Sequence, residues 1–314
     1  MATAQPLPEP LQGRSFFIAE SDQCNVTRRR TTAGDLYTPS RGIRVPWDVQ
    51  QGLDDCLRPL LGVTPDAAAS HSTAALLWGI PLPPRLSGRF DIHLSRDAAK
   101  NRPVRFGVAG HRTRFSPGDV VELRGLRVTS PLRTWLDLAG VLALDELVAA
   151  GDFLVCEHDR IFGPKRVPLV PLQALQHAAR HGFRRRGIVN ARQAAELIRV
   201  GADSPPETRI RLSLHRAGLP ETVLNHVVKD ARGNHVSWPD LALPEWKISI
   251  EYDGEHHRSQ RQREIDGARD LLMRQLGWRQ LRITKAMLDK DGDKAVVRMV
   301  RDALYEQGWG GLAA

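Results

Sequence analysis

The sequence has little of what membrane spans, disulfide frameworks and zinc fingers require. No apolar run approaches the roughly 20 residues that cross a bilayer, and the opening MATAQPLPEP lacks the basic and apolar pattern of a signal peptide. The three cysteines, Cys24, Cys56 and Cys156, lie far apart and form no CxxC pair. We therefore expect a cytoplasmic protein with no membrane partner, whose cysteines are reduced structural thiols and not disulfides or zinc ligands.

Acidic residues are outnumbered. Lysine and arginine total 45 against 36 aspartates and glutamates, a net charge of +9. This balance favours a polyanionic partner, which in the cytoplasm is usually nucleic acid, although a generally arginine-rich proteome would give the same charge. A length of 314 residues predicts two or three domains.

We divide the chain into four segments. Residues 1–48 comprise a Pro-rich tail, expected to be disordered to about residue 12, followed by a helix, a basic helix in VTRRRTTAGDL and a strand in RGIRVP. These elements suit either a winged-helix module or a cap packed on the next domain. Residues 49–156 read as an α/β domain, residues 157–202 as a helical connector, and residues 203–314 as a second α/β domain.

The 49–156 segment shows a helix in SHSTAALLWGIPLP, capped by Ser70 or Ser72, and strands in FDIHLS, RFGVAGHRT and LRGLRVTS. Three histidines, His71, His93 and His111, are scattered through it. Nothing in their spacing joins them to carboxylates in the manner of a metal site, so we interpret them as structural.

The 203–314 segment has the element order αβββαβα. Helices are expected in SPPETRIRLSLHRAG, EIDGARDLLMRQLGW and KAVVRMVRDALYEQ, and strands in NHVVKD, HVSWPDLAL, KISIEYD and RQLRIT. Short links predict antiparallel hairpins among the first three strands. A right-handed crossover predicts RQLRIT parallel to KISIEYD, which gives a mixed sheet.

An acidic pair stands at the end of the KISIEYD strand. Side chains alternate along a strand, so Ile248, Ile250 and Tyr252 share one face, and Glu251 and Asp253 share the other. The Cα atoms of the two acidic residues lie about 6.6 Å apart at a rise of about 3.3 Å per residue. Their carboxylates can therefore converge on one cation.

Two more carboxylates can reach this pair. Asp240 lies on the neighbouring hairpin strand, and Glu207 lies in the first turn of the leading helix. A set made of Asp240, Glu251 and Asp253, with Glu207 as a further member, offers only oxygen ligands. Such a set suits Mg²⁺ or Mn²⁺ better than Zn²⁺.

Structural explanations compete with this metal site. Ser204 and Glu207 fit a capping box, which does not exclude a second role for the glutamate. Asp240 could be a plain turn residue, and the acidic pair could be neutralised by Arg279 or Arg282.

The stretch after the strand supplies the remaining chemistry for phosphodiester hydrolysis. His257 is favoured over His256 for proton transfer because histidine titrates near neutral pH. Asp266 and Arg269 stand one helical turn apart, so they can pair and support the histidine loop. The residues expected to bind nucleic acid are His256, Arg258, Arg261, Arg263 and Arg269, with the arginines after His257 holding the phosphate backbone.

Several motifs resemble the restriction-endonuclease-like PD-(D/E)xK superfamily, and within it the very-short-patch-repair endonucleases. The resemblance covers about residues 204–284 and rests on SPPET, WPDLALPEWKISIEYDGEHH, DGAR and LGWRQLRIT. The superfamily usually has a lysine two positions after the strand glutamate, and this chain has Asp253 there. Very-short-patch-type domains also lack that lysine and depend on histidine, which leaves the proton-transfer assignment open.

This resemblance implies residue roles and a function. Asp240 and Glu251 would be the main metal ligands, Glu207 the helix carboxylate, and Asp253 with His257 a second catalytic cluster. We expect a magnesium-dependent endonuclease acting on nucleic acid, most readily double-stranded DNA. The alternatives are a non-catalytic DNA-binding regulator with a nuclease fold, and an RNA-cleaving toxin. The sequence identifies no protein partner.

The front half carries a second resemblance. RGIRVP, SHSTAALLWGIPLP and GLRVTSPLRTWLDLA are similar to antitoxin-type proteins of AbiE abortive-infection systems, over about residues 14–155. Those proteins join a winged helix to an α/β domain. The resemblance implies DNA binding or a phage-defence context, with DNA repair as another setting for the nuclease, and assigns no functional residue.

Overall fold

The structure is a computed structural model that describes residues 4–87, 91–158, 165–182, 185–254 and 260–311, except for the side chains of residues 260–266. The chain forms two compact units, Met1–Val141 and Leu142–Ala314. Both are α/β, and each contains a mixed sheet. The division lies inside the predicted 49–156 segment, because the helix that ends that segment packs on helices of the second unit.

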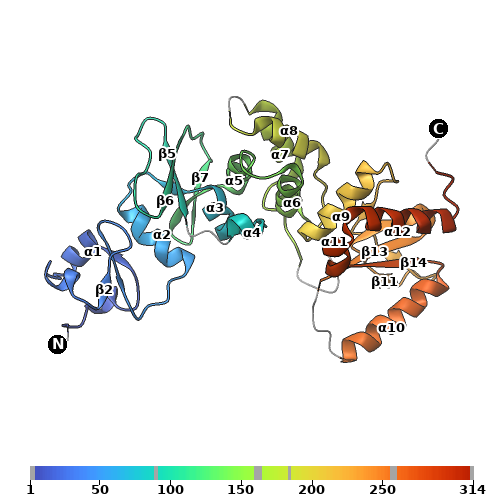
Figure 1. Cartoon of the computed structure of the whole chain (residues 1–314), viewed down its shortest axis with the longest axis horizontal. Coiled ribbons are helices and arrows are strands. Elements are labelled where there is room, and N and C mark those ends of the chain that lie inside the picture. The colour runs from blue at the N-terminus through green and yellow to red at the C-terminus, as the bar shows by residue number, and fades with distance from the viewer. Residues whose placement is uncertain (1–3, 88–90, 159–164, 183–184, 255–259, 312–314) are drawn as a thin grey trace. The chain divides into compact units, whose positions relative to one another are not determined.

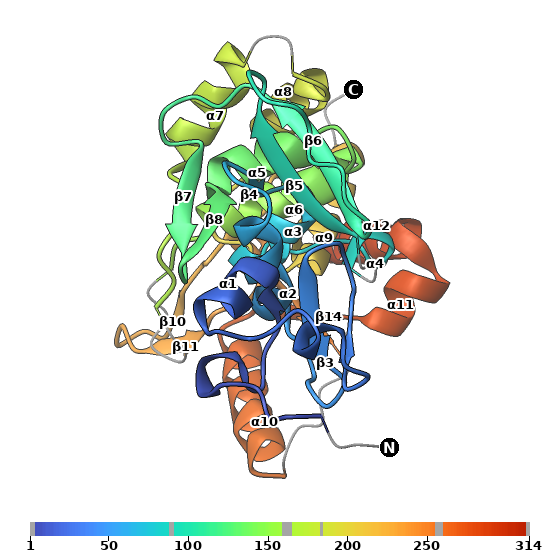
Figure 2. The same ribbon diagram turned by 90° about the vertical axis from the view of Figure 1, so that its left-hand side faces the viewer.

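The N-terminal unit contains two sheets with helices around them (Figure 1). Its strands and α-helices are β1 (Phe16–Phe17), α1 (Ile18–Gln23), β2 (Leu36–Tyr37), β3 (Ile43–Pro46), α2 (Leu53–Gly62), β4 (Ala68–Ala69), α3 (His71–Trp78), α4 (Pro84–Ser87), β5 (Ile92–Asp97), β6 (Val108–Thr113), β7 (Val120–Leu123), β8 (Leu126–Thr129) and α5 (Pro131–Leu138). The sheets have the orders β1-β3-β2 and β6-β5-β4-β8-β7. In the larger sheet β5 and β6 are parallel, as Figure 2 shows.

The first 48 residues differ from their prediction. Leu7 and Leu11 are buried in one apolar cluster with Phe16, so the described part of the Pro-rich tail is packed against this unit. The expected basic helix does not form. Its sequence makes a single 3-10 turn, Arg30–Thr32, and then strand β2. A winged helix in residues 4–48 would need that second helix, and the described residues lack it.

A buried arginine organises the larger sheet of this unit. Arg133 on α5 is 1% exposed and pairs with Asp119 at 2.6 Å and with Asp137 at 2.9 Å. It also donates to Thr113 Oγ1 on β6. Because a buried guanidinium needs its charge balanced, these contacts hold α5 against the end of the sheet.

The C-terminal unit combines helices α6 to α9 with a sheet and three more helices. Its elements are α6 (Leu144–Val155), α7 (Leu172–His181), α8 (Ile188–Leu197), α9 (Pro205–Arg216), β9 (Val223–Leu224), β10 (Val228–Lys229), β11 (His235–Ser237), β12 (Leu241–Leu243), β13 (Ile248–Asp253), α10 (Gln260–Gln275), β14 (Arg279–Thr284), α11 (Lys285–Lys290) and α12 (Gly292–Glu306). In the described parts of the chain, no helix is both long enough and apolar enough to cross a membrane.

The predicted strand pairing is confirmed in its main features. Strand β13 is antiparallel to β12 and parallel to β14, in a sheet of order β14-β13-β12-β9. The expected strand HVSWPDLAL is two strands: β11 forms a separate hairpin with β10, and β12 joins the main sheet. Pro239 lies between them and has no N–H to donate to a strand ladder.

The predicted faces of β13 are also confirmed. Ile248 and Ile250 are buried in one cluster with Ile210 of α9 and Val300 of α12, and Tyr252 packs against that cluster. Glu251 and Asp253 therefore point to the opposite side of the sheet.

A buried aspartate joins α6 to α9. Asp152 is 1% exposed and accepts hydrogen bonds from Thr208 Oγ1, Arg211 Nη2 and the Arg199 backbone N–H, each at 2.8 Å. Burial raises the pKa of the carboxyl group, and Arg211 acts in the opposite direction. Two of these contacts lie in α9, so the position of that helix depends on Asp152.

Asp152→Ala should lower the free energy of unfolding by about 3–5 kcal/mol, because it leaves the buried Arg211 without its charge partner. Asp145→Ala is the matched control: Asp145 pairs with Arg216 at the exposed surface, where such pairs contribute about 1 kcal/mol or less. Urea unfolding of both variants measures the difference. A loss below about 1 kcal/mol for Asp152→Ala would contradict the assigned role.

Candidate functional site

The N-terminus of α9 presents a buried carboxylate. Ser204 is the N-cap and Glu207 lies three residues later, 5% exposed. Its Oε2 accepts from the Asp203 backbone N–H at 2.9 Å, and its Oε1 accepts from Ser204 Oγ at 2.7 Å. The predicted capping box is not formed, because the Ser204 side chain accepts no bond from the helix backbone and Glu207 does not accept from the Ser204 N–H. The backbone donor is Asp203, one residue before the cap.

The carboxylate of Asp240 also affects the pKa of Glu207. Burial, and then the negative charge of Asp240, raise its pKa to about 7. Two hydrogen bonds to the carboxylate act against this shift but do not cancel it. The helix carboxylate and the hairpin carboxylate thus lie close enough to interact electrostatically.

Asp240 immediately precedes β12, the strand that pairs with β13. The register pairs Leu241 with Ile250, which sets Asp240 opposite Glu251. Its Oδ2 accepts a hydrogen bond from the Tyr252 backbone N–H at 2.8 Å. Asp240 therefore faces the strand that carries the acidic pair and is hydrogen-bonded to it.

Glu251 contacts a guanidinium, but not either of those expected as partners. Arg269 on α10 places Nη2 3.4 Å from Glu251 Oε2. Arg279 pairs with Glu306, and Arg282 pairs with Asp270. Arg269 was expected to contact nucleic acid, and in this structure its guanidinium reaches the acidic strand.

The structure does not describe several side chains that were predicted to transfer protons or bind nucleic acid. His256, His257 and Arg258 lie outside the described residues. Arg261, Arg263 and Asp266 lie in α10, but their side chains are outside the described part of the chain. Their assigned roles, including the pairing of Asp266 with Arg269, remain predictions.

Two groups of three side chains have the geometry to hold a metal ion. One consists of His71, His93 and His111, and the other of Cys156, His158 and Asp203; within each, the ligand atoms lie within 4.8 Å of one another. The expected set of Asp240, Glu251 and Asp253 does not form such a group among the described residues. The magnesium site therefore remains a prediction that needs these carboxylates to move closer together.

The cysteine group was missed by the sequence interpretation. Cys156 Sγ donates to Asp203 Oδ1 at 3.2 Å, and His158 Nε2 lies 3.0 Å from the same oxygen. The Cys-x-His spacing at 156–158 is the signal that was available. Arg166 also donates to this oxygen, at 3.3 Å. Its guanidinium already neutralises the Asp203 carboxylate at the place where a metal ion would bind.

The histidine group was also missed, because its members were interpreted as scattered. The rings of His71 and His111 stack with centroids 3.8 Å apart, and His93 Nδ1 lies 2.9 Å from His111 Nε2. The sequence gives no direct signal, since the three residues meet only through the register of β5 and β6 and the position of α3.

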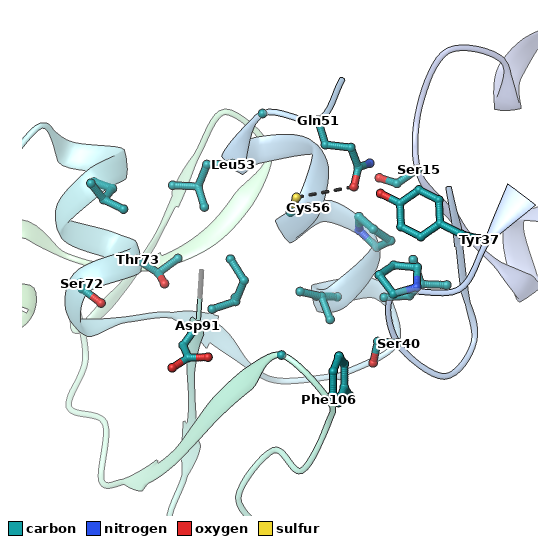
Figure 3. A pocket seen from close by; sticks show the side chains of 18 of the residues that line it. Ser15, Tyr37, Ser40, Gln51, Leu53, Cys56, Ser72, Thr73, Asp91 and Phe106 are labelled. Carbon is teal, nitrogen blue, oxygen red and sulfur yellow. Dashed lines mark hydrogen bonds between the residues drawn. The ribbon is translucent and has the colours of Figure 1, made fainter. Parts of the chain in front are cut away.

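The N-terminal unit also encloses a cavity of about 510 Å³, shown in Figure 3. Its wall is mainly apolar and includes Ile43 and Leu53. Cys56 lines it and donates to Gln51 Oε1 at 3.5 Å. Burial, and then the charge of Asp55, raises the pKa of the Cys56 thiol, so the thiol stays protonated and is a poor nucleophile. The cavity suits a small apolar ligand better than cysteine chemistry.

Comparison of the chain with models of known families, with curated proteins and with solved structures gave no match in any of the three. Both resemblances therefore rest on motifs in the sequence alone. The geometry of the described residues supplies the independent arguments for function.

The raised pKa of Glu207 predicts that its contribution to stability falls as the pH rises. The pKa is about 7 in the folded chain against an ordinary 4.5, so between these values the folded state holds a proton that the unfolded state has lost. The contribution is fully present below about pH 4.5 and is lost as the pH rises through about 7. The change is on the order of 3 kcal/mol.

Urea unfolding of wild type and Glu207→Gln at about pH 4.5 and about pH 8 tests this. The variant should lose less stability than wild type over that interval. Glu245→Gln, at an exposed position of the same unit, should keep the wild-type dependence. Equal pH dependence in wild type and Glu207→Gln would show that the glutamate has an ordinary pKa.

Proposed function

We propose that the C-terminal unit is a metal-dependent endonuclease that hydrolyses phosphodiester bonds in DNA. The observation that carries this proposal is the position of Asp240, just before β12 and near the acidic residues of two other elements, Glu207 of α9 and Glu251 of β13. Asp240 stands opposite Glu251, and its charge reaches Glu207. A cluster of this kind is costly without a proton or a cation to neutralise it.

The residues fit a hard divalent cation in ligand type. Asp240, Glu251 and Asp253 offer oxygen atoms only, which Mg²⁺ and Mn²⁺ prefer. A bound ion of this class would neutralise phosphate charge and lower the pKa of a water molecule. With a pKa of about 7, Glu207 can hold or release a proton near neutral pH. His257, which lies outside the described residues, remains the proposed proton carrier.

The order of elements supports the proposal. Helix α9 precedes the β12–β13 hairpin, and α10 then crosses over to β14, which is parallel to β13. This arrangement agrees with the αβββαβ core that the resemblance to very-short-patch-repair endonucleases implies. The net charge of +9 favours a polyanionic substrate. Phage defence or DNA repair in the cytoplasm is the setting we propose.

A second function is favoured by one specific contact. Arg269 Nη2 lies 3.4 Å from Glu251 Oε2, where it competes with a cation for the carboxylate. If Arg269 neutralises this face permanently, the unit binds DNA without cutting it and acts as an antitoxin-like regulator. An RNA-cleaving toxin that uses the same residues is the third possibility. A panel of DNA and RNA substrates distinguishes it from the other two.

Purified full-length protein with Mg²⁺ or Mn²⁺ should nick or cut DNA. Asp240→Asn should reduce the rate by at least about 100-fold, because a metal ligand contributes several kcal/mol and each 1.36 kcal/mol is a factor of ten. Asp302→Asn makes the same charge change at an exposed position on α12 of the same unit and should leave the rate unchanged.

The substrates are single- and double-stranded DNA and RNA, with gel-resolved products as the readout and circular dichroism as the check on folding. Cleavage that survives in folded Asp240→Asn places the active site elsewhere. Salt-dependent DNA binding without cleavage in either metal favours the regulator, and selective cleavage of RNA favours the toxin.

A further inference from the structure

Three histidines from different elements meet in the N-terminal unit, remote in sequence from the acidic residues. His71 is the first residue of α3, His93 lies on β5 and His111 on β6. The parallel register pairs Ser95 with His111, so alternation along β5 puts His93, Ser95 and His111 on one face of the sheet. Helix α3 packs against β5 and brings His71 to that face.

The three rings are in direct contact. His93 Nδ1 lies 2.9 Å from His111 Nε2. The His71 and His111 rings stack at 3.8 Å, and the His71 and His93 centroids lie 5.6 Å apart. All three side chains are half-buried, so an ion from solution can reach them. One nitrogen from each ring lies within 4.8 Å of the others.

Buried serines hold the first histidine in place. Ser70 Oγ lies 3.0 Å from His71 Nδ1, and Ser95 Oγ donates to Ser70 Oγ at 2.7 Å. Both serines are fully buried. A histidine that binds a metal generally donates its other ring N–H to an oxygen. Ser70 supplies such an oxygen on Nδ1, which assigns Nε2 as the ligand atom of His71.

The backbone at this point is also fixed. His71 has φ of 51°, in the left-handed region that non-glycine residues rarely adopt. The backbone N–H of His93 donates to Thr73 Oγ1 at 2.8 Å, which ties β5 to α3. Backbone strain of this kind is concentrated at ligand and active sites.

The surroundings of His111 disfavour its charged form. Burial, followed by the charge of His93, lowers the pKa of His111 to about 4.

We propose that His71, His93 and His111 bind one Zn²⁺ ion, with a fourth coordination position left for water or a small ligand. Neutral imidazoles are a preferred ligand set for zinc, and three of them with an open position are typical of sites that activate water. Binding requires the stacked rings of His71 and His111 to turn until their lone pairs converge.

Two other places on the chain could bind zinc instead. In the cysteine group, Arg166 lies 3.3 Å from the Asp203 oxygen and repels a cation. On α7, His177 and His181 stack with centroids 4.1 Å apart, one helical turn from each other, and could chelate an ion at the surface. The test therefore needs to distinguish zinc bound at either of these places from zinc bound by the three histidines.

Full-length protein freed of metal with a chelator and then kept in excess Mg²⁺, which fills the carboxylate site, should bind one Zn²⁺ per chain in calorimetric titration. Removing an oxygen that orients a ligand usually weakens metal binding by about 10- to 100-fold, which is the loss expected for Ser70→Ala. His93→Gln and His111→Gln remove ligands and should each lose at least about 100-fold. Cys156→Ser and His181→Ala should retain wild-type affinity.

Cobalt(II) loading gives an independent readout. Nitrogen ligation by the triad should give visible d–d absorption without a thiolate-to-metal charge-transfer band, and His111→Gln should abolish it. Circular dichroism checks each variant, and His93→Gln carries the test if His111→Gln does not fold. A thiolate band, loss of binding in His181→Ala, wild-type affinity in both folded glutamine variants, or no binding to wild type would each overturn the assignment.

Discussion

The requirement that a buried charge be balanced organises each unit. In the C-terminal unit, Asp152 of α6 accepts hydrogen bonds from Thr208 and Arg211 of α9. Both residues lie in the first two turns of α9, the helix whose N-terminus carries Glu207. The position of this proposed catalytic carboxylate therefore depends on the contacts of Asp152. In the N-terminal unit, Arg133 has the same function and holds α5 to the sheet.

Fixing α9 in this way has an electrostatic consequence. Glu207 is buried within reach of the charge of Asp240, and its pKa rises to about 7. Two like charges in a poorly solvated place can be relieved by a proton or by a cation. Near neutral pH the proton is only loosely held, so a divalent ion could displace it at small cost. Arg269, at 3.4 Å from Glu251, offers the competing means of neutralisation.

The elements that could be predicted from the sequence have local causes. Alternation gave the faces of β13, and short links gave its antiparallel partner β12. The histidine triad could not be predicted, because it depends on a register between β5 and β6 and on the packing of α3. The burial of Leu7 and Leu11 was missed for a related reason: a Pro-rich composition suggests disorder, but these two leucines pack into a cluster with residues distant in sequence.

The two candidate metal sites differ in ligand chemistry, and this difference bears on how both would work in one chain. Zinc binds most oxygen and nitrogen ligands more tightly than magnesium does. Affinity alone would therefore let zinc occupy the carboxylates of Asp240, Glu251 and Asp253 as well. Selectivity must then come from ligand type and metal availability. Neutral imidazoles attract Mg²⁺ weakly, which leaves the triad to zinc, whereas the abundant Mg²⁺ can fill a carboxylate site that scarce zinc does not reach. Independent occupancy therefore requires the nitrogen and oxygen ligands to be separated, as they are here between the two units.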